Sequence, residues 1–359
     1  MDARFKTQFQ KRLLAWFDIE KRDLPWRRTN DPYRILVSEV MLQQTQAATA
    51  AVYYKRFIRL FPNVRKLARA PLDDVLKSWE GLGYYGRARN LHRTARMVAA
   101  SHGGKVPDAF ETLAALPGIG RSTAGAVLSI AFGKRMPILD GNVIRLLSRV
   151  FRITENVDSR ETRARLWSLS ERLLPETRLR AFNEGLMELG ASVCRPRNPA
   201  CGSCPFSRFC QAKRLSLQGD LPIRTPKKSL PHFDVTAGVV SRNGKFLITK
   251  RPPKGLLGGL WEFPGGKLEK GETLKACLRR EIREELGITV RVGQFLVSIR
   301  HAYSHFKITL HVYRCRYEGG RIRLRGCDDY AWIGASELER YAFPGADRKI
   351  IQRLKEDQS

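Results

Sequence analysis

Four cysteines lie close together in this chain and limit what the surrounding segment can fold into. They occur as Cys194-x6-Cys201-x2-Cys204-x5-Cys210, whereas the other three cysteines of the chain are scattered. Four thiolates within 17 residues can enclose one centre, and both zinc and an iron–sulfur cluster accept four cysteines. Zinc sites usually show two short paired spacings, and only one is present here. Disulfide pairing is not expected in the cytoplasm.

The composition of the chain changes after this cysteine segment. Residues 1–190 read as helical, because apolar residues recur at helical spacing between proline and glycine breakers. The helical stretches expected from this spacing are Ile35–Ala50, Ala51–Phe61, Leu72–Trp79 and Thr123–Phe132. Residues 215–232 contain three prolines and little periodicity, which is typical of a linker.

The segment that follows the linker is rich in predicted strands. Val235–Ser241 and Lys245–Lys250 flank an Asn-Gly pair, which is a strong hairpin signal. Further strands are expected at Phe295–Ile299 and Lys307–Cys315, with a charged helix at Glu272–Leu286. We therefore expect a multidomain protein with an all-α domain at 1–214, a linker at 215–232 and an α+β domain at 233–359.

The chain is strongly basic and has no membrane signal. It contains 65 Lys and Arg against 35 Asp and Glu, a net charge of +30, and both halves contribute. A polyanion such as nucleic acid is the simplest partner for such a surface; the alternative is an organism whose proteins are generally basic. No apolar run approaches the length of a membrane span, and the N-terminus has no signal-peptide core. We expect a cytoplasmic, nucleoid-associated monomer without a membrane partner.

A glycine-containing turn between two predicted helices can bind phosphate. Leu116-Pro117-Gly118-Ile119-Gly120 leaves backbone N–H groups uncovered at the start of the next helix, and Arg121 adds positive charge. The alternative is an ordinary helix–helix turn. The pattern resembles the hairpin of helix–hairpin–helix DNA repair proteins. About twenty residues later comes Asp140, which by itself would read as a turn residue before Gly141.

Several further segments resemble the MutY-type adenine DNA glycosylases. They are Leu24–Arg27, Ser38–Thr45, Gly81–Tyr85 and Phe182–Glu184. Together with the hairpin, Asp140 and the cysteine spacing, the resemblance covers about residues 5–212. It implies a helix–hairpin–helix glycosylase domain whose cysteines at 194, 201, 204 and 210 hold a structural 4Fe–4S cluster. Cys194, Cys201, Cys204 and Cys210 would be its ligands.

The resemblance also implies catalytic roles for two carboxyl groups. Glu39 would protonate adenine N7 so that the base can leave, and its apolar neighbours would keep it protonated near neutral pH. Asp140 would stabilise the positive charge that develops on the sugar, with Asn142 orienting it or a water molecule. Arg27 and Glu184 match residues that contact the extruded adenine.

Other matched positions concern DNA binding and the type of reaction. Gln44, Leu82 and Tyr84 match residues that wedge into the duplex, although plain core packing is the alternative for Leu82 and Tyr84. Gly118, Gly120 and Arg121 would contact phosphate. Ser122 stands where lyase relatives of the endonuclease III kind carry a lysine nucleophile. Because a hydroxyl cannot form an imine, base release without strand cleavage is expected, with Ser122 close to Asp140.

Residues 233–350 resemble the C-terminal domain of MutY-type enzymes, which is related to the Nudix hydrolase MutT. His301–Phe306 looks like the loop that recognises 8-oxoguanine, with contacts from Tyr303, Ser304 and His305. A β-turn without that role is the alternative. The expected substrate is double-stranded DNA in which adenine pairs with 8-oxoguanine or guanine.

The same region carries every position of a Nudix box. The motif runs from Gly266 to Ile288, and Glu281, Glu284 and Glu285 fall on one helix face. Such a face suits Mg²⁺ on a diphosphate. Two readings stay open: an inherited scaffold with a solvated acidic face, or a second active site that hydrolyses oxidised nucleoside triphosphates. A non-catalytic iron–sulfur DNA-binding protein and a lyase are the remaining hypotheses.

Overall fold

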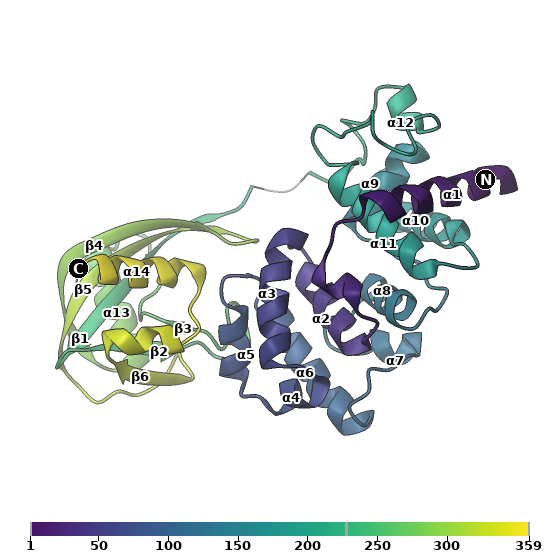
Figure 1. The fold of residues 1–359 in the computed structure, drawn as a ribbon. Coiled ribbons are helices and arrows are strands. Elements are labelled where there is room, and N and C mark those ends of the chain that lie inside the picture. Colours follow the sequence, from purple (N-terminus) through teal and green to yellow (C-terminus); the bar gives the residue numbers. More distant parts are fainter. Residues whose placement is uncertain (1, 227–228, 358–359) are drawn as a thin grey trace. The chain divides into compact units, whose positions relative to one another are not determined.

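The computed structural model describes residues 2–226 and 229–357 of the 359-residue chain. Its contacts divide the chain into two compact units (Figure 1). The first unit contains Met1–Arg69 and Asn90–Lys227, and the second contains Ala70–Arg89 and Lys228–Ser359. The N-terminal part is helical and the C-terminal part holds a sheet, as the sequence predicts. The unexpected feature is that residues 70–89 group with the C-terminal part.

The first unit is built from helices of moderate length. Their order is α1 (Ala3–Glu20), η1 (Pro25–Arg28), α2 (Pro32–Leu42), α3 (Ala47–Leu60), α4 (Val64–Arg69), α6 (Gly86–Ser101, whose first residues belong to the second unit), α7 (Phe110–Ala114), α8 (Arg121–Ala131), α9 (Gly141–Val150), α10 (Arg160–Leu173), α11 (Leu179–Ser192) and α12 (Gln211–Arg214). Helix α11 packs against α1, α8 and α9, and α2 packs against α8. In the part of the chain that the structure describes, no helix is long and apolar enough to cross a membrane.

One predicted helix is divided in the structure. The apolar spacing predicts a helix over Ile35–Ala50, but α2 ends at Leu42 and α3 begins at Ala47. Gln44 lies in the intervening turn with a φ of 58°, which no helix accommodates. No glycine or proline marks this break, and the prediction of one continuous helix is therefore wrong.

An aromatic core connects the N-terminal helix to the cysteine segment. Phe9 on α1, Phe182 on α11 and Phe206 between the cysteines are all fully buried. The rings of Phe9 and Phe206 stack with their centroids 4.1 Å apart. This packing fixes the otherwise irregular cysteine segment against two helices.

Part of the predicted linker is docked onto the first unit. The backbone N–H of Val157 donates to the carbonyl of Ile223 (2.9 Å), and the N–H of Thr225 donates to Asp158 (3.2 Å). Leu221 is buried. The proline-rich composition of 215–232 therefore does not mean that all of it is an extended connection.

The second unit contains a six-stranded mixed sheet. Its strands are β1 (His232–Arg242), β2 (Lys245–Lys250), β3 (Trp261–Glu262), β4 (Thr289–Ala302), β5 (Lys307–Gly319) and β6 (Asp329–Ile333). The order is β3-β2-β1-β5-β4, and β6 pairs with β2. Strands β1 and β5 are parallel, and the other pairs are antiparallel. The predicted Asn-Gly hairpin between β1 and β2 is confirmed.

Two hydrophobic cores flank this sheet, so that the second unit has three layers. One core includes Ile350 and Leu354 of helix α14 (Gly345–Glu356). The other includes Leu278 and Ile282 of helix α13 (Leu274–Leu286). The unit also holds α5 (Leu72–Trp79) and η2 (Ala335–Arg340).

Candidate active site

Glu39 lies on α2 in apolar surroundings. Its neighbours Ile35 and Val40 are buried, and Glu39 itself is only partly exposed. Burial, followed by the negative charges of Asp140 and Glu184, raises the pKa of Glu39 to about 8. A carboxyl group with this pKa keeps its proton at neutral pH and can act as a general acid. Its electrostatic coupling to Asp140 and Glu184 brings these three predicted residues into one site.

Asp140 is the N-cap of α9. Its carboxylate accepts hydrogen bonds from the backbone N–H of Val143 (2.7 Å) and from Nδ2 of Asn142 (3.0 Å). Burial raises the pKa of Asp140 above its usual range, and these donors together with the charge of Arg145 oppose that rise. By contrast, each resolved contribution to the pKa of Glu39 is upward. The donors therefore favour the anion at Asp140, and no such donor opposes the rise in the pKa of Glu39.

Ser122 and Asn142 both lie beside Asp140. The Oγ of Ser122, in the first turn of α8, accepts the N–H of Leu139 at 3.2 Å. The side chain of Asn142 donates to Asp140 and accepts from Arg145 at 2.8 Å. Asn142 is thus held at both ends, which orients the carboxylate of Asp140.

Arg27 and Glu184 are largely buried and lie close enough for the charge of Arg27 to lower the pKa of Glu184. The Arg27 side chain, in η1, is 12% exposed, and its Nε is buried without a hydrogen-bond partner among the described residues. Burial raises the pKa of Glu184, while the charges of Arg180 and Arg27 lower it in part. A base placed here would meet both a donor and an acceptor.

Two partners of the site residues, Glu188 and Arg145, were missed by sequence reasoning. Glu188 accepts hydrogen bonds from Arg22 (2.5 Å) and Arg27 (2.8 Å). It follows Glu184 by one helical turn, and this i, i+4 spacing is the signal that could have found it. Arg145 donates to the carbonyl of Cys194 at 2.7 Å as well as to Asn142, and no sequence motif pointed to it.

Gly190 on α11 is packed against Asn142. A Cβ at position 190 would lie 2.6 Å from the Cβ of Asn142 and 2.9 Å from its carbonyl oxygen. We expect Gly190→Ala to lower the free energy of unfolding by about 1–3 kcal/mol. It should also slow the reaction, because Asn142 must move. Denaturant unfolding checks the first effect.

Gly219→Ala is the matched control for this substitution, because a Cβ at position 219 meets nothing within 4 Å. An unfolding midpoint of Gly190→Ala equal to that of Gly219→Ala would show that α9 and α11 are not packed as described.

The predicted glycine-containing turn is present between α7 and α8. Gly118 has a φ of 77°, and a Cβ there would lie 2.8 Å from the Cβ of Asn90. Gly120 is the N-cap of α8 and supplies no side-chain cap, so that N–H groups of the first turn point outward. The Arg121 guanidinium stacks on the ring of Trp167, 4.1 Å from its centroid.

The predicted wedge residues differ in exposure. Gln44 in the first unit and Tyr84 in the second are exposed, and both have positive φ (58° and 49°). Such backbone strain in a non-glycine residue is often found at functional sites. Leu82 is only 7% exposed, which agrees with the packing alternative.

The four clustered cysteines line one pocket. Cys194, Cys201, Cys204 and Cys210 all line one cavity of about 20 Å³. Across residues 2–226 and 229–357, no three His, Cys, Asp or Glu groups converge as ligands of a single ion. Burial and the charges of the other cysteines raise the pKa of Cys204 to about 12, so four thiolates here need a positive centre. Cysteines spaced around a cavity fit a polynuclear cluster better than one zinc ion.

Helix α9 connects this pocket to Asp140. Arg149, which is 2% exposed, donates to Sγ of Cys194 (3.4 Å) and to the carbonyls of Arg195 (2.7 Å) and Leu221 (2.9 Å). The same helix has Asp140 as its N-cap. The cysteine segment therefore supports the helix that carries the carboxylate.

The predicted 8-oxoguanine loop connects β4 to β5. The N–H of Tyr303 donates to the carbonyl of Phe306 at 2.8 Å, which closes the turn. Tyr303 packs against His301 and Phe306, with ring centroids 4.6 Å and 5.0 Å apart. Ser304 and His305 are exposed at the tip, where a DNA base could reach them.

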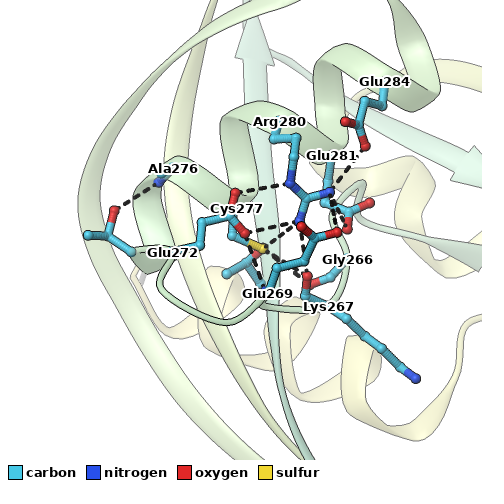
Figure 2. A network of polar contacts seen from close by, with 11 residues as sticks. Gly266, Lys267, Glu269, Glu272, Ala276, Cys277, Arg280, Glu281 and Glu284 are labelled. Carbon is cyan, nitrogen blue, oxygen red and sulfur yellow. Dashed lines mark hydrogen bonds and ion pairs between the residues drawn. The ribbon is translucent and has the colours of Figure 1, made fainter.

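The acidic residues of the Nudix box gather around Arg280 (Figure 2). Its guanidinium bonds to Glu272 (3.0 Å), Glu281 (3.0 Å) and Glu284 (3.1 Å). Burial and neighbouring carboxylates raise the pKa of Glu285 to about 7. The donor chemistry suits Mg²⁺, but these side chains do not converge as ligands of one ion in the described chain. Arg280 serves as their counter-ion, so the residues as placed do not form a magnesium site.

Comparison with known proteins assigns both parts of the chain. Residues 37–172 match the HhH-GPD superfamily of base excision DNA repair proteins, and residues 235–353 match the NUDIX domain. A thermostable thymine-DNA glycosylase of known structure covers 60% of this chain at 33% identity with a TM-score of 0.55. An endonuclease III–DNA complex, at 22% identity and a TM-score of 0.52, shares the fold.

Curated relatives extend over nearly the whole chain. The adenine DNA glycosylase of Rattus norvegicus is 36% identical over 98% of this chain and 78% of its own length. That of Buchnera aphidicola from Acyrthosiphon pisum is 32% identical over 98% of this chain and 99% of its own length. Similarity thus spans both the helical and the sheet-containing parts.

Proposed function

Because the chain belongs to the adenine DNA glycosylases of base excision repair, we propose that it excises adenine opposite 8-oxoguanine or guanine in double-stranded DNA. The observation that carries the proposal is that Glu39, among buried residues of α2, and Asp140, the N-cap of α9, belong to one site, where the charge of Asp140 helps to raise the pKa of Glu39. The fold, the hairpin and the net charge of +30 suit a DNA substrate. We expect the enzyme to act as a monomer.

The proposed reaction breaks the N-glycosidic bond of a nucleotide turned out of the duplex. Glu39 gives its proton to the leaving adenine, held by Arg27 and Glu184. Asp140 stabilises the positive charge on the sugar, and Asn142 holds its carboxylate in position. Water then adds to the sugar carbon and gives its proton to the carboxylate left on Glu39, which produces an abasic site. Ser122 offers no amine for an imine, so the strand stays uncut.

The partner base is read by the second unit in this proposal. Ser304, flanked by Tyr303 and His305, would bond to 8-oxoguanine, while Gln44 and Tyr84 fill the space left by the adenine. Gly118, Gly120 and Arg121 would hold a phosphate of the same duplex. The exposure of Ser304 and His305 supports this role.

We propose a 4Fe–4S cluster as the resident cofactor of Cys194, Cys201, Cys204 and Cys210. A cluster supplies the positive centre that four clustered thiolates require, and its role here is structural. Replacing Cys204 with Ser should lower the iron content and expose the segment 194–214 to protease. Iron and sulfide analysis should give about four of each per wild-type chain.

Cys277→Ser serves as the control for this cysteine substitution, because Cys277 lies in the second unit. Zinc instead of iron in the purified protein would refute the cluster assignment.

A second candidate function is the hydrolysis of oxidised nucleoside triphosphates at the Nudix box. The raised pKa of Glu285, caused by burial and by nearby carboxylates, favours a cation there. Because Arg280 already balances these charges, we derive no reaction step through a metal. The test incubates the protein with an oxidised nucleoside triphosphate and Mg²⁺. Release of diphosphate or phosphate by the wild type, and not by Glu284→Gln, would establish this activity.

A single-turnover assay tests the main proposal. A duplex with adenine opposite 8-oxoguanine is incubated with excess protein and then treated with alkali to cut abasic sites. We expect cleavage only after alkali, and no trapping of protein on DNA by borohydride. An absence of alkali-dependent product would reject the proposed function.

A further inference from the structure

Phe343 is one of the residues that anchor the segment 70–89 within the second unit. The carboxylate of Glu80 accepts the N–H of Phe343 at 2.9 Å, and the hydroxyl of Tyr85 donates to the carbonyl of Phe343 at 3.2 Å. Glu80 and Tyr85 are 9% and 6% exposed, and Phe343 is fully buried. Lys77 adds a bond to the carbonyl of Tyr341 at 2.8 Å. Both backbone groups of Phe343 are therefore used to hold this segment.

The turn between Glu80 and Tyr85 is itself tightly fixed. The N–H of Gly81 donates to the hydroxyl of Tyr85 at 3.3 Å, and the indole of Trp79 donates to the carbonyl of Gly83 at 3.1 Å. Gly81, Gly83 and Tyr84 have positive φ values of 92°, 74° and 49°. A turn held in this way transmits a shift of its anchor instead of absorbing it.

Phe343 also supports the loop that carries Ser304. It belongs to the same hydrophobic core against which Tyr303 and Phe306 pack. Two residues further on, a Cβ at Gly345 would lie 3.0 Å from the ring of His301, and that ring contacts Tyr303. The segment Phe343–Gly345 thus contacts both the turn that carries Tyr84 and the loop that carries Ser304.

We propose that Glu80 and Tyr85 are specificity-determining positioning residues, which couple recognition of the base opposite adenine to the placement of Tyr84. The inference rests on the proposed function. When Ser304 binds 8-oxoguanine, the loop and the segment Phe343–Gly345 adopt a single conformation. Glu80 and Tyr85, which are bonded to Phe343, then fix the position of Tyr84. With guanine the loop makes fewer bonds, and the turn is placed less well.

The experiment measures the ratio of single-turnover rates for adenine opposite 8-oxoguanine and opposite guanine. It compares wild type, Tyr85→Phe, Glu80→Gln, Ser304→Ala and the Tyr85→Phe/Ser304→Ala double variant. Tyr85→Phe removes one hydroxyl, so it preserves the fold even if Glu80→Gln does not. Tyr317→Phe is the matched control, because Tyr317 also donates to a backbone carbonyl, that of Gly320, in the same unit.

We expect the rate ratio to fall about fivefold or more in Tyr85→Phe and Glu80→Gln. It should stay at the wild-type value in Tyr317→Phe. The double variant should have the same rate ratio as Ser304→Ala, because both substitutions interrupt the same coupling between the Ser304 loop and Tyr84.

Equal losses for both duplexes, an unchanged ratio, or additive effects in the double variant would overturn the inference while leaving the proposed function intact. Wild type without adenine release from either duplex would reject the proposed function itself.

Discussion

Asp140→Asn is expected to reduce adenine release by about a thousandfold or more while DNA binding persists. The neutral amide cannot stabilise a positive sugar. Asn is also a good N-cap, so that α9 keeps its start and the fold is preserved. Single-turnover kinetics on a duplex with adenine opposite 8-oxoguanine, together with a gel-shift measurement of affinity, check both parts.

Asp31→Asn is the matched control for Asp140→Asn. Asp31 is the N-cap of α2 and accepts the N–H of Arg34 at 2.9 Å, so the substitution makes the same chemical change at another helix start. We expect it to leave the rate near wild type. A rate for Asp140→Asn within about tenfold of wild type would remove Asp140 from the chemistry. Retained binding without base release would also exclude a non-catalytic DNA-binding protein.

Residues recognised by local pattern were predicted well. The cysteine spacing indicated one centre, and the four side chains line one pocket. The Gly-x-Gly turn and the Asn-Gly pair each specify a local backbone shape, which a short stretch of sequence determines on its own. A helix at Glu39 was also expected from its regular apolar spacing, although its end at Leu42 was not.

Features that depend on distant contacts were not predictable. Arg145 and Glu188 act through partners far along the chain, such as Cys194 and Arg22, and no periodicity records such pairing. Residues 70–89 were assigned to the helical domain because α5 has an ordinary helical pattern, yet they group with residues 228–359. The break at Gln44 carries no glycine or proline. In these cases tertiary packing selects one of several backbone conformations or residue partners that the local sequence does not distinguish.

The rate of adenine release at neutral pH should depend on whether Glu39 is protonated. Its pKa lies at about 8 because burial and the charges of Asp140 and Glu184 disfavour the anion. The active form has Glu39 protonated, so the rate of adenine release should level off as the pH falls from about 10 through that pKa. It should fall about tenfold per pH unit above it. Single-turnover rates in saturating enzyme, measured from pH 6 to about 10, give the profile.

Glu39→Gln tests the same proton by removing it. We expect adenine release to fall by about a thousandfold, because Gln fills the same space and cannot protonate the base. Any residual rate should lack the decline near pH 8, since its titrating group is gone. Glu20→Gln, at the exposed end of α1, is the control and should keep the wild-type profile. If the decline persists unchanged in Glu39→Gln, another group carries the proton and the assignment of the general acid is wrong.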